Sequence, residues 1–160
     1  MKINAKAFLS LLTIPLLISC AGTQDLAPDG SSIPIGVNTI IIQSDKQQGE
    51  AYSDIGSYLI NQGYSIENTS PEFFSLTTDY KSASEGYGLM RADVNVSISA
   101  SVSALESGSA IILTARVDNA LADESRVEQR GQSGSVMRIA WDELYRVAKA
   151  YSDRLTFETR

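Results

Sequence analysis

The clearest pattern along the chain is a strict alternation of apolar and polar residues across Asp93–Ala104. Aliphatic residues occupy every second position, and serine or asparagine fills the positions between them. A repeat of two residues is typical of an antiparallel strand with one buried face and one face in water. After a polar turn at Glu106–Ser109, apolar residues alternate again from Ile111 to Val117. The two segments together predict a β-hairpin.

Other apolar patterns predict a further strand and two helices. Three consecutive isoleucines within Val37–Gln43 are typical of a strand that is buried on both faces. Apolar residues at helical spacing predict a helix over Gln47–Gln62, with Gly63 as its stop. A longer apolar stripe predicts a second helix over Ser135–Leu155. Trp141 lies in this stripe, so we expect it in the core rather than at a ligand site.

Shorter segments complete the predicted fold. Two strands are expected at Tyr64–Glu67 and Phe73–Tyr80, on either side of a break at Thr69–Pro71. The polar residues of Asn119–Gly134 predict a loop. This order of elements predicts an α+β fold, in which a mainly antiparallel sheet of four to five strands has two helices packed on one face.

The first nineteen residues follow a different pattern, in three parts. Lys2 and Lys6 give a positive start, residues 7–18 carry no charge and are mostly apolar, and small residues surround Cys20. This succession is typical of a secretory signal peptide. A permanent transmembrane helix needs about 20 apolar residues, so this stretch is too short for one. Pro15 also interrupts it.

The end of this region, Leu17-Ile18-Ser19-Cys20, resembles the lipobox of bacterial lipoproteins. The resemblance implies that a diacylglycerol is joined to the Cys20 thiol, that the signal peptide is cleaved between Ser19 and Cys20, and that acyl chains hold the protein on a membrane. Ala21 stands where an aspartate is the usual inner-membrane retention signal, so the resemblance implies the outer membrane, on its periplasmic face. An ordinary signal peptide with a chance cysteine is the alternative.

These features divide the 160 residues into three parts. Residues 1–19 are the predicted signal peptide. Residues 20–34 are small, polar and rich in proline and glycine, which predicts a lipidated N-terminus and a flexible tether. Residues 35–160 have the length of one domain, and we expect a single periplasmic α+β domain there.

Charge and residue types exclude several classes of function. The chain has 13 Lys and Arg against 19 Asp and Glu, a net charge of −6, which disfavours nucleic-acid binding. It contains no histidine, which excludes Ser-His-Asp and Cys-His nucleophile systems and histidine-ligated zinc. Cys20 is the only cysteine, so disulfides within the chain and clusters of cysteine ligands are excluded as well. We therefore expect no metal and no cofactor.

Two groups of residues are candidates for binding. The serines between the aliphatic residues of the predicted hairpin have small hydroxyl side chains that permit close approach, so their face is a candidate docking surface for a partner strand or a glycan. The alternative is the solvent face of an ordinary sheet. These serines are Ser97, Ser99, Ser101 and Ser103.

A set of tyrosines and one arginine is the second candidate. Tyrosine offers an apolar ring with a polar tip, which suits a sugar or a lipid in a cleft. The alternative is that most of these residues are ordinary core and rim residues. The set consists of Tyr52, Tyr58, Tyr64, Tyr80, Tyr87 and Arg91.

Two pairs of neighbouring carboxylates, Asp123-Glu124 and Asp142-Glu143, are candidates for acid–base chemistry. Adjacent residues on a helix do not face one another, and glycoside hydrolysis needs two carboxylates brought together in a cleft. We therefore assign no catalytic residue and do not expect an enzyme. A histidine-free carboxylate hydrolase acting on a glycan is the remaining enzymatic alternative.

The anchor, the missing histidine and the lack of a convergent set of polar residues predict a binding role. The order of elements is loosely similar to that of small accessory lipoproteins of envelope assembly, without a shared motif. This resemblance implies an accessory component of the cell envelope, which contacts the membrane through acyl chains on Cys20 and binds an envelope protein. The alternative is a carrier or sensor of a small apolar or sugar ligand in a cleft between sheet and helices.

Overall fold

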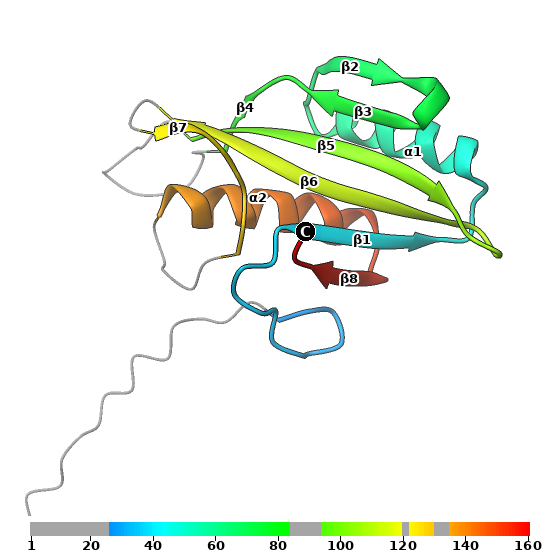
Figure 1. Ribbon diagram of the computed structural model, residues 1–160, viewed down its shortest axis with the longest axis horizontal. Helices are drawn as coiled ribbons and strands as arrows, with labels where there is room; N and C mark the ends of the chain where they lie inside the picture. Colours follow the sequence, from blue (N-terminus) through cyan, green and yellow to red (C-terminus); the bar gives the residue numbers. More distant parts are fainter. Residues whose placement is uncertain (1–25, 84–93, 120–121, 130–134) are drawn as a thin grey trace, which may run out of the picture.

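The computed structural model describes residues 26–83, 94–119, 122–129 and 135–160. Within these residues the chain forms two α-helices and one antiparallel sheet (Figure 1). The elements are β1 (Thr39–Ser44), α1 (Gln48–Asn61), β2 (Ile66–Ser70), the 3-10 turn η1 (Pro71–Phe73), β3 (Ser75–Thr78), β4 (Lys81–Ser82), β5 (Asn95–Ala104), β6 (Ser109–Asn119), β7 (Ala122–Arg126), α2 (Val136–Tyr151) and β8 (Leu155–Glu158).

The predicted hairpin, β5 and β6, forms the centre of the sheet. Its register runs from Asn95 opposite Asp118 to Ala104 opposite Ser109. The outer side of β5 is shared by β3 and β4, and the outer side of β6 is shared by β1 and β7. β2 and β8 extend the sheet to its two edges. Short strands therefore flank one long hairpin on both sides.

The hairpin turn requires glycine at one position. Gly108 has φ +83, a conformation that L side chains rarely adopt, and a Cβ atom there would overlap the carbonyl oxygen of Ser44. The turn is closed by the Leu105 amide, which donates to the Gly108 carbonyl oxygen at 3.2 Å. This turn fixes the register that places the aliphatic residues of both strands on one face.

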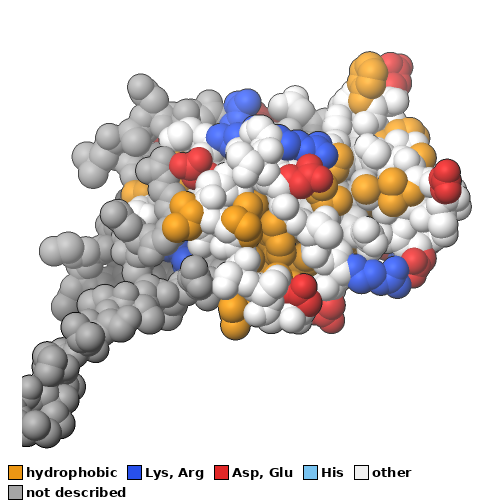
Figure 2. Space-filling view, turned by 60° about the horizontal axis from the view of Figure 1, so that its bottom comes forward, with side chains coloured by type: hydrophobic (Ala, Val, Ile, Leu, Met, Phe, Trp, Pro, Cys, Tyr) orange, Lys and Arg blue, Asp and Glu red, His pale blue; other side chains and the backbone are white. Residues whose placement is uncertain are grey.

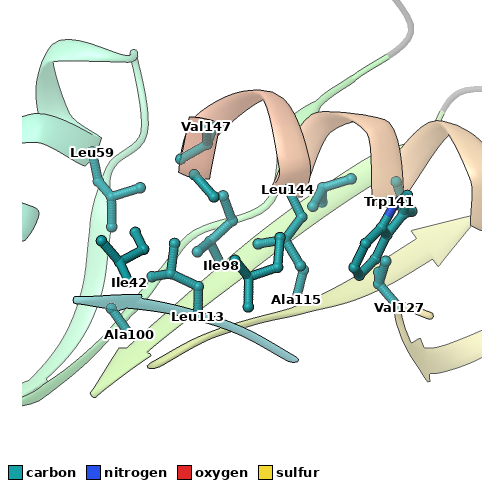
Figure 3. Packing of buried hydrophobic residues seen from close by; sticks show 14 of the residues in the cluster. Ile42, Leu59, Ile98, Ala100, Leu113, Ala115, Val127, Trp141, Leu144 and Val147 are labelled. Carbon is teal, nitrogen blue, oxygen red and sulfur yellow. The ribbon is translucent and has the colours of Figure 1, made fainter. Parts of the chain in front are cut away.

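The core lies between that aliphatic face and the two helices. Leu59 of α1 and Leu144 and Trp141 of α2 point toward the sheet, and Ile98 and Leu113 of the central hairpin point toward the helices (Figure 3). All five side chains are completely buried, which confirms the core position predicted for Trp141. Burial of each large apolar side chain contributes about 1.5–3 kcal/mol. The α+β class and the packing of both helices on one face are therefore as predicted.

α2 ends at Tyr151, earlier than the predicted end at Leu155. Ser152 has an extended backbone, and Leu155 begins β8, where it lies opposite Ile42 of β1. Leu155 is four residues beyond Tyr151, so it fits the helical stripe by spacing. The longer helix was a wrong prediction, because the same apolar residue reaches the core from a strand.

Within the described residues the sheet has eight strands, so the prediction of four to five was wrong. The unpredicted strands are short or polar. β7 lies within Asn119–Gly134, which was predicted as a loop, and its sequence ADESR has no aliphatic alternation. β2 includes Thr69 and Ser70, which were expected to break the chain. These strands form because their backbones hydrogen-bond to a neighbouring strand. The pattern of side chains along the sequence does not reveal such pairing.

The described chain already lies against the domain upstream of Ile35. Leu26 forms an isolated antiparallel bridge with Ser32, and the side chains of Ala27 and Ile33 are buried. This part of the predicted tether therefore belongs to the folded unit. The rest of the predicted tether lies outside the described residues.

Candidate functional site

The predicted lipidation residue Cys20 and the cleavage position after Ser19 lie outside the described residues. Tyr87 and Arg91 of the predicted binding cleft lie outside them as well. In the part of the chain that the structure describes, neither helix is long and apolar enough to cross a membrane. The remaining candidates are the serines of β5, four tyrosines and the carboxylate pair on α2.

The four candidate serines share one face of β5 but differ in environment. Ser97 is buried, and its hydroxyl donates to the carbonyl oxygen of Thr78 at 2.6 Å. Ser99 and Ser101 are half-buried, and Ser103 is exposed. Ser97 therefore belongs to the interior of the fold, and the other three serines remain candidates for contact with a partner.

Hydroxyl groups from neighbouring strands continue this surface across the sheet. Thr77, Ser99 and Thr114 lie opposite one another in β3, β5 and β6, and the Thr77 and Ser99 hydroxyls are 3.2 Å apart. Ser75 and Ser101 form the adjoining row. We call these five residues the hydroxyl face. Both described helices pack on the opposite side of the sheet, so they leave the hydroxyl face uncovered.

Arginines border the hydroxyl face. Arg116 and Arg126 lie opposite each other in β6 and β7, and both are exposed. The Arg126 guanidinium donates to the carbonyl oxygen of Arg160 at 2.8 Å and to the Thr39 hydroxyl at 3.3 Å. These bonds hold the Arg126 side chain along the sheet where β1 and β7 meet.

Two adjoining cavities of about 440 and 280 Å³ lie over this region. Ser99, Thr114 and Arg126 line both of them, and the described residues around the two cavities include no Asp or Glu. Hydroxyl groups both donate and accept hydrogen bonds, whereas a guanidinium group only donates. The surface is therefore suited to polar groups, and to carboxylates near the arginines.

The candidate tyrosines do not surround one cleft. Tyr52 packs edge-on against Phe74, with ring centroids 5.9 Å apart. Tyr58 packs edge-on against Tyr151 at 5.0 Å. Tyr80 is exposed. These contacts correspond to the core and rim positions of the alternative interpretation, and core side chains fill the space between helices and sheet in Figure 3.

Tyr64, the remaining tyrosine of the described set, belongs to a cluster around Glu143. The Tyr64 hydroxyl donates to Glu143 Oε1 at 2.7 Å, and Arg146 donates to both carboxylate oxygens at 2.8 Å. Lys81 Nζ lies 4.0 Å from Glu143 Oε1 and donates to the Gln62 carbonyl oxygen at 2.7 Å. A cavity of about 560 Å³ lies between the end of α1, β4 and α2, and Glu143 and Arg146 line it.

Burial, hydrogen bonds and neighbouring charges in this cluster keep Glu143 and Tyr64 each in one protonation state at neutral pH. Burial alone raises the pKa of the Glu143 carboxyl, but hydrogen bonds from Arg146 and Tyr64 and the charges of Arg146 and Lys81 hold that pKa below its usual value. Burial and the neighbouring Glu143 carboxylate raise the pKa of Tyr64. At neutral pH Glu143 is ionised and Tyr64 is protonated. The cluster therefore ties the chain around β4 to α2 by charge-assisted hydrogen bonds.

The predicted carboxylate pair on α2 is divided between two arginines. Asp142 pairs with Arg138 at 2.8 Å, and Glu143 pairs with Arg146. Both pairs have the spacing of one helical turn, which was visible in the sequence. The link from Glu143 to Tyr64 was not visible, because 79 residues separate the two along the chain. The side chains of the other pair, Asp123-Glu124, lie outside the described set.

No family model matches this chain, and a search of curated proteins finds no match either. Among solved structures, the chain is similar to a DUF4468 family protein from Bacteroides ovatus, known from a crystal structure. The similarity covers 73% of this chain and 82% of that chain, with 10% sequence identity and a TM-score of 0.40. A likeness at this level carries no argument about the function of either chain.

Proposed function

We propose that the chain is a bacterial outer-membrane lipoprotein, attached through acyl chains on Cys20, whose α+β domain acts by binding another component of the cell envelope. The observation that carries this proposal is the succession of a positive start, an uncharged apolar run and Leu17-Ile18-Ser19-Cys20. The thiol of Cys20 is the nucleophile that takes up the lipid. More than one acyl chain gives stable attachment, because each buried methylene contributes about 0.8 kcal/mol.

The hydroxyl face supports the binding part of the proposal. Its side chains are small, so a partner can approach the backbone of the sheet closely. The positive charges of Arg116 and Arg126 at its border favour a partner with carboxylate groups, because complementary charge steers two surfaces together. We therefore propose an envelope protein with polar and acidic side chains as the partner.

The attachment is tested by acyl labelling in a bacterial host, with Cys20→Ser as the variant. The wild-type chain is expected to incorporate palmitate and to lose its signal peptide. Cys20→Ser is expected to incorporate none and to keep the signal peptide, because the lipoprotein peptidase acts on the lipidated form. Equal palmitate incorporation by the two proteins would refute the proposed anchor.

The binding role is tested separately by crosslinking in intact envelopes, followed by purification of the acylated wild-type chain. We expect one defined envelope protein in the crosslinked complex. If control lipoproteins yield their own complexes under the same conditions and this chain yields none, the binding role is wrong while the anchor still stands.

A further inference from the structure

The N-terminal part of the described chain is fastened to the domain. We call residues 26–36 the docked segment. Tyr145 Oη donates to the Leu26 carbonyl oxygen at 2.6 Å, and the Gly36 amide donates to the Gln129 carbonyl oxygen at 2.8 Å. The buried side chain of Ile33 packs into the core between these two points. The docked segment therefore has a fixed place on the molecule.

Two large apolar side chains of the docked segment point away from the core. Leu26 is 54% exposed and Ile35 is 70% exposed. In Figure 1 the docked segment forms the blue loop below β8, beyond that edge of the sheet. Figure 2 turns this side of the molecule forward, and orange apolar side chains gather in the middle of that view. This side therefore exposes apolar surface beside the point where the described chain begins.

The distance from Cys20 to this surface is limited by chain length. Six residue steps separate Cys20 from Leu26, and a fully extended chain spans at most about 3.6 Å per residue, so the two lie within about 22 Å of each other. A domain of this size has a radius of gyration of about 14 Å and is roughly 35 Å across. The link from Cys20 to Leu26 is therefore shorter than the domain is wide. A lipid on Cys20 therefore holds the start of the docked segment within about 22 Å of the membrane surface.

We propose that the docked segment rests on the lipid surface, with Leu26 and Ile35 in the interfacial layer of the bilayer. This inference rests on the lipidation of Cys20 in the proposed function. Asp29 limits the depth of insertion. It lies in the same segment, and hydrogen bonds from the Ser31 hydroxyl and amide lower the pKa of its carboxyl, so it stays ionised and remains in water. The contact is interfacial, and the hydrocarbon core is not entered.

The opposite edge of the sheet provides a matched control. Phe73, in η1 between β2 and β3, is 75% exposed, similar to Ile35. β2 and β8 are the two edges of the sheet, five strand spacings apart, which corresponds to about 24 Å. An exposed apolar residue at this edge is expected to stay in water even though its side chain is as hydrophobic as Ile35.

The test uses cysteine substitutions in the full acylated protein. The thiol of Cys20 is blocked by lipid, so Ile35→Cys, Leu26→Cys and Phe73→Cys each create a single free thiol for a nitroxide spin label. The labelled proteins are placed on vesicles of phosphatidylethanolamine and phosphatidylglycerol, and collisions of the label with oxygen and with a water-soluble nickel complex are compared. The same variants beginning at Ala21, and so without signal peptide, Cys20 and lipid, provide the reference in buffer.

On vesicles, labels at positions 35 and 26 are expected to lose most of their collisions with nickel and to gain collisions with oxygen, whereas the label at position 73 is unchanged. Equal nickel accessibility at positions 35 and 73 on vesicles would overturn the inference. Protection at position 35 that occurs already in buffer would overturn it too, because a second copy of the chain would then cover the segment. Mass spectrometry of the purified protein separates the two proposals: an unmodified Cys20 refutes the anchor, and an acylated Cys20 with an accessible position 35 refutes only the membrane contact.

Discussion

Leu113 and Thr114 are neighbours in β6, but they lie on opposite faces of the sheet. The Leu113 side chain is completely buried under the helices, whereas Thr114 is half-buried on the hydroxyl face. The same holds along the partner strand, where Ala100 is buried and Ser101 is half-buried. The side chains on one face of the hairpin therefore pack against the helices and stabilise the fold. The side chains on the other face contribute much less to its stability.

This difference has a consequence for function. Side chains on the packed face are constrained by volume, because protein interiors are close-packed. Side chains on the hydroxyl face are constrained mainly by the need to stay small and polar. A substitution on the first face is expected to affect stability, and a substitution on the second is expected to affect binding before it affects stability. Substitutions on the two faces should therefore differ in how much they lower the free energy of unfolding.

Leu113→Ala is expected to have the largest effect. It removes a fully buried side chain from the centre of the core and leaves a cavity, which lowers the free energy of unfolding by about 2–5 kcal/mol. Urea unfolding followed by the fluorescence of buried Trp141 measures it. A loss below about 1 kcal/mol would contradict the packed interface seen in Figure 3, because surface substitutions cost that little.

Gly108→Ala tests whether the turn holds the two faces in register. A side chain there is strained by the positive φ and overlaps the Ser44 carbonyl group, so we expect a loss of about 2 kcal/mol or more in the free energy of unfolding. Gly30→Ala is the matched control, because Gly30 has φ +82 but no atom near its added Cβ. Equal losses in the two variants would show that the overlap with Ser44 has no cost.

Glu143→Gln tests the charged cluster that ties the chain around β4 to α2. Loss of the charged hydrogen bonds to Arg146 and Tyr64 is expected to lower the free energy of unfolding by about 1–2 kcal/mol at neutral pH. The pKa of Glu143 in the folded protein lies below its usual value of 4.5, so its contribution is present above that pH and is lost as the pH falls through the folded value.

The pH dependence provides the control for this variant. Urea unfolding of both proteins is measured across the acidic range. The stability difference between wild type and Glu143→Gln should narrow as the pH falls below 4.5. A difference that is constant over this range would mean that the effect of the substitution does not come from the ionised carboxylate.

Thr114→Ala is expected to have the smallest effect. Its side chain lies on the hydroxyl face beside Leu113, and its loss is expected to change the free energy of unfolding by about 0.5 kcal/mol or less. The same urea measurement applies. A loss as large as that of Leu113→Ala would mean that both faces of the hairpin support the fold and that the separation between them is wrong.

The sequence was sufficient to predict the elements that have a long side-chain pattern. The alternation from Val94 to Ala104 predicted β5, and the apolar residues Ala51, Ile55 and Leu59 predicted α1. Both patterns arise because the apolar residues of the element are buried against one surface. The alternation also predicted which residues of the hairpin share the face toward the helices and which share the opposite face.

Features that depend on backbone pairing or on distant partners were not predicted. β7 and β8 are short strands held by hydrogen bonds to β6 and β1, and their side chains show no sustained pattern. The contact between Tyr64 and Glu143 depends on how α1 and α2 are placed over the sheet, which local spacing does not report. Likewise, the burial of Ser97 depends on its bond to Thr78 in another strand.

We propose above that the acylated domain binds an envelope protein, and the hydroxyl face is the surface expected to make this contact. The most direct measurement is crosslinking in intact envelopes with Ser101→Trp, which places a large side chain on the hydroxyl face, and with Ser57→Trp, which places the same side chain on the exposed surface of α1. Circular dichroism and palmitate incorporation establish that both variants are folded and acylated. We predict that Ser57→Trp yields the wild-type complex and that Ser101→Trp does not. Recovery of the same complex in the same amount from both variants would show that the partner does not bind the hydroxyl face.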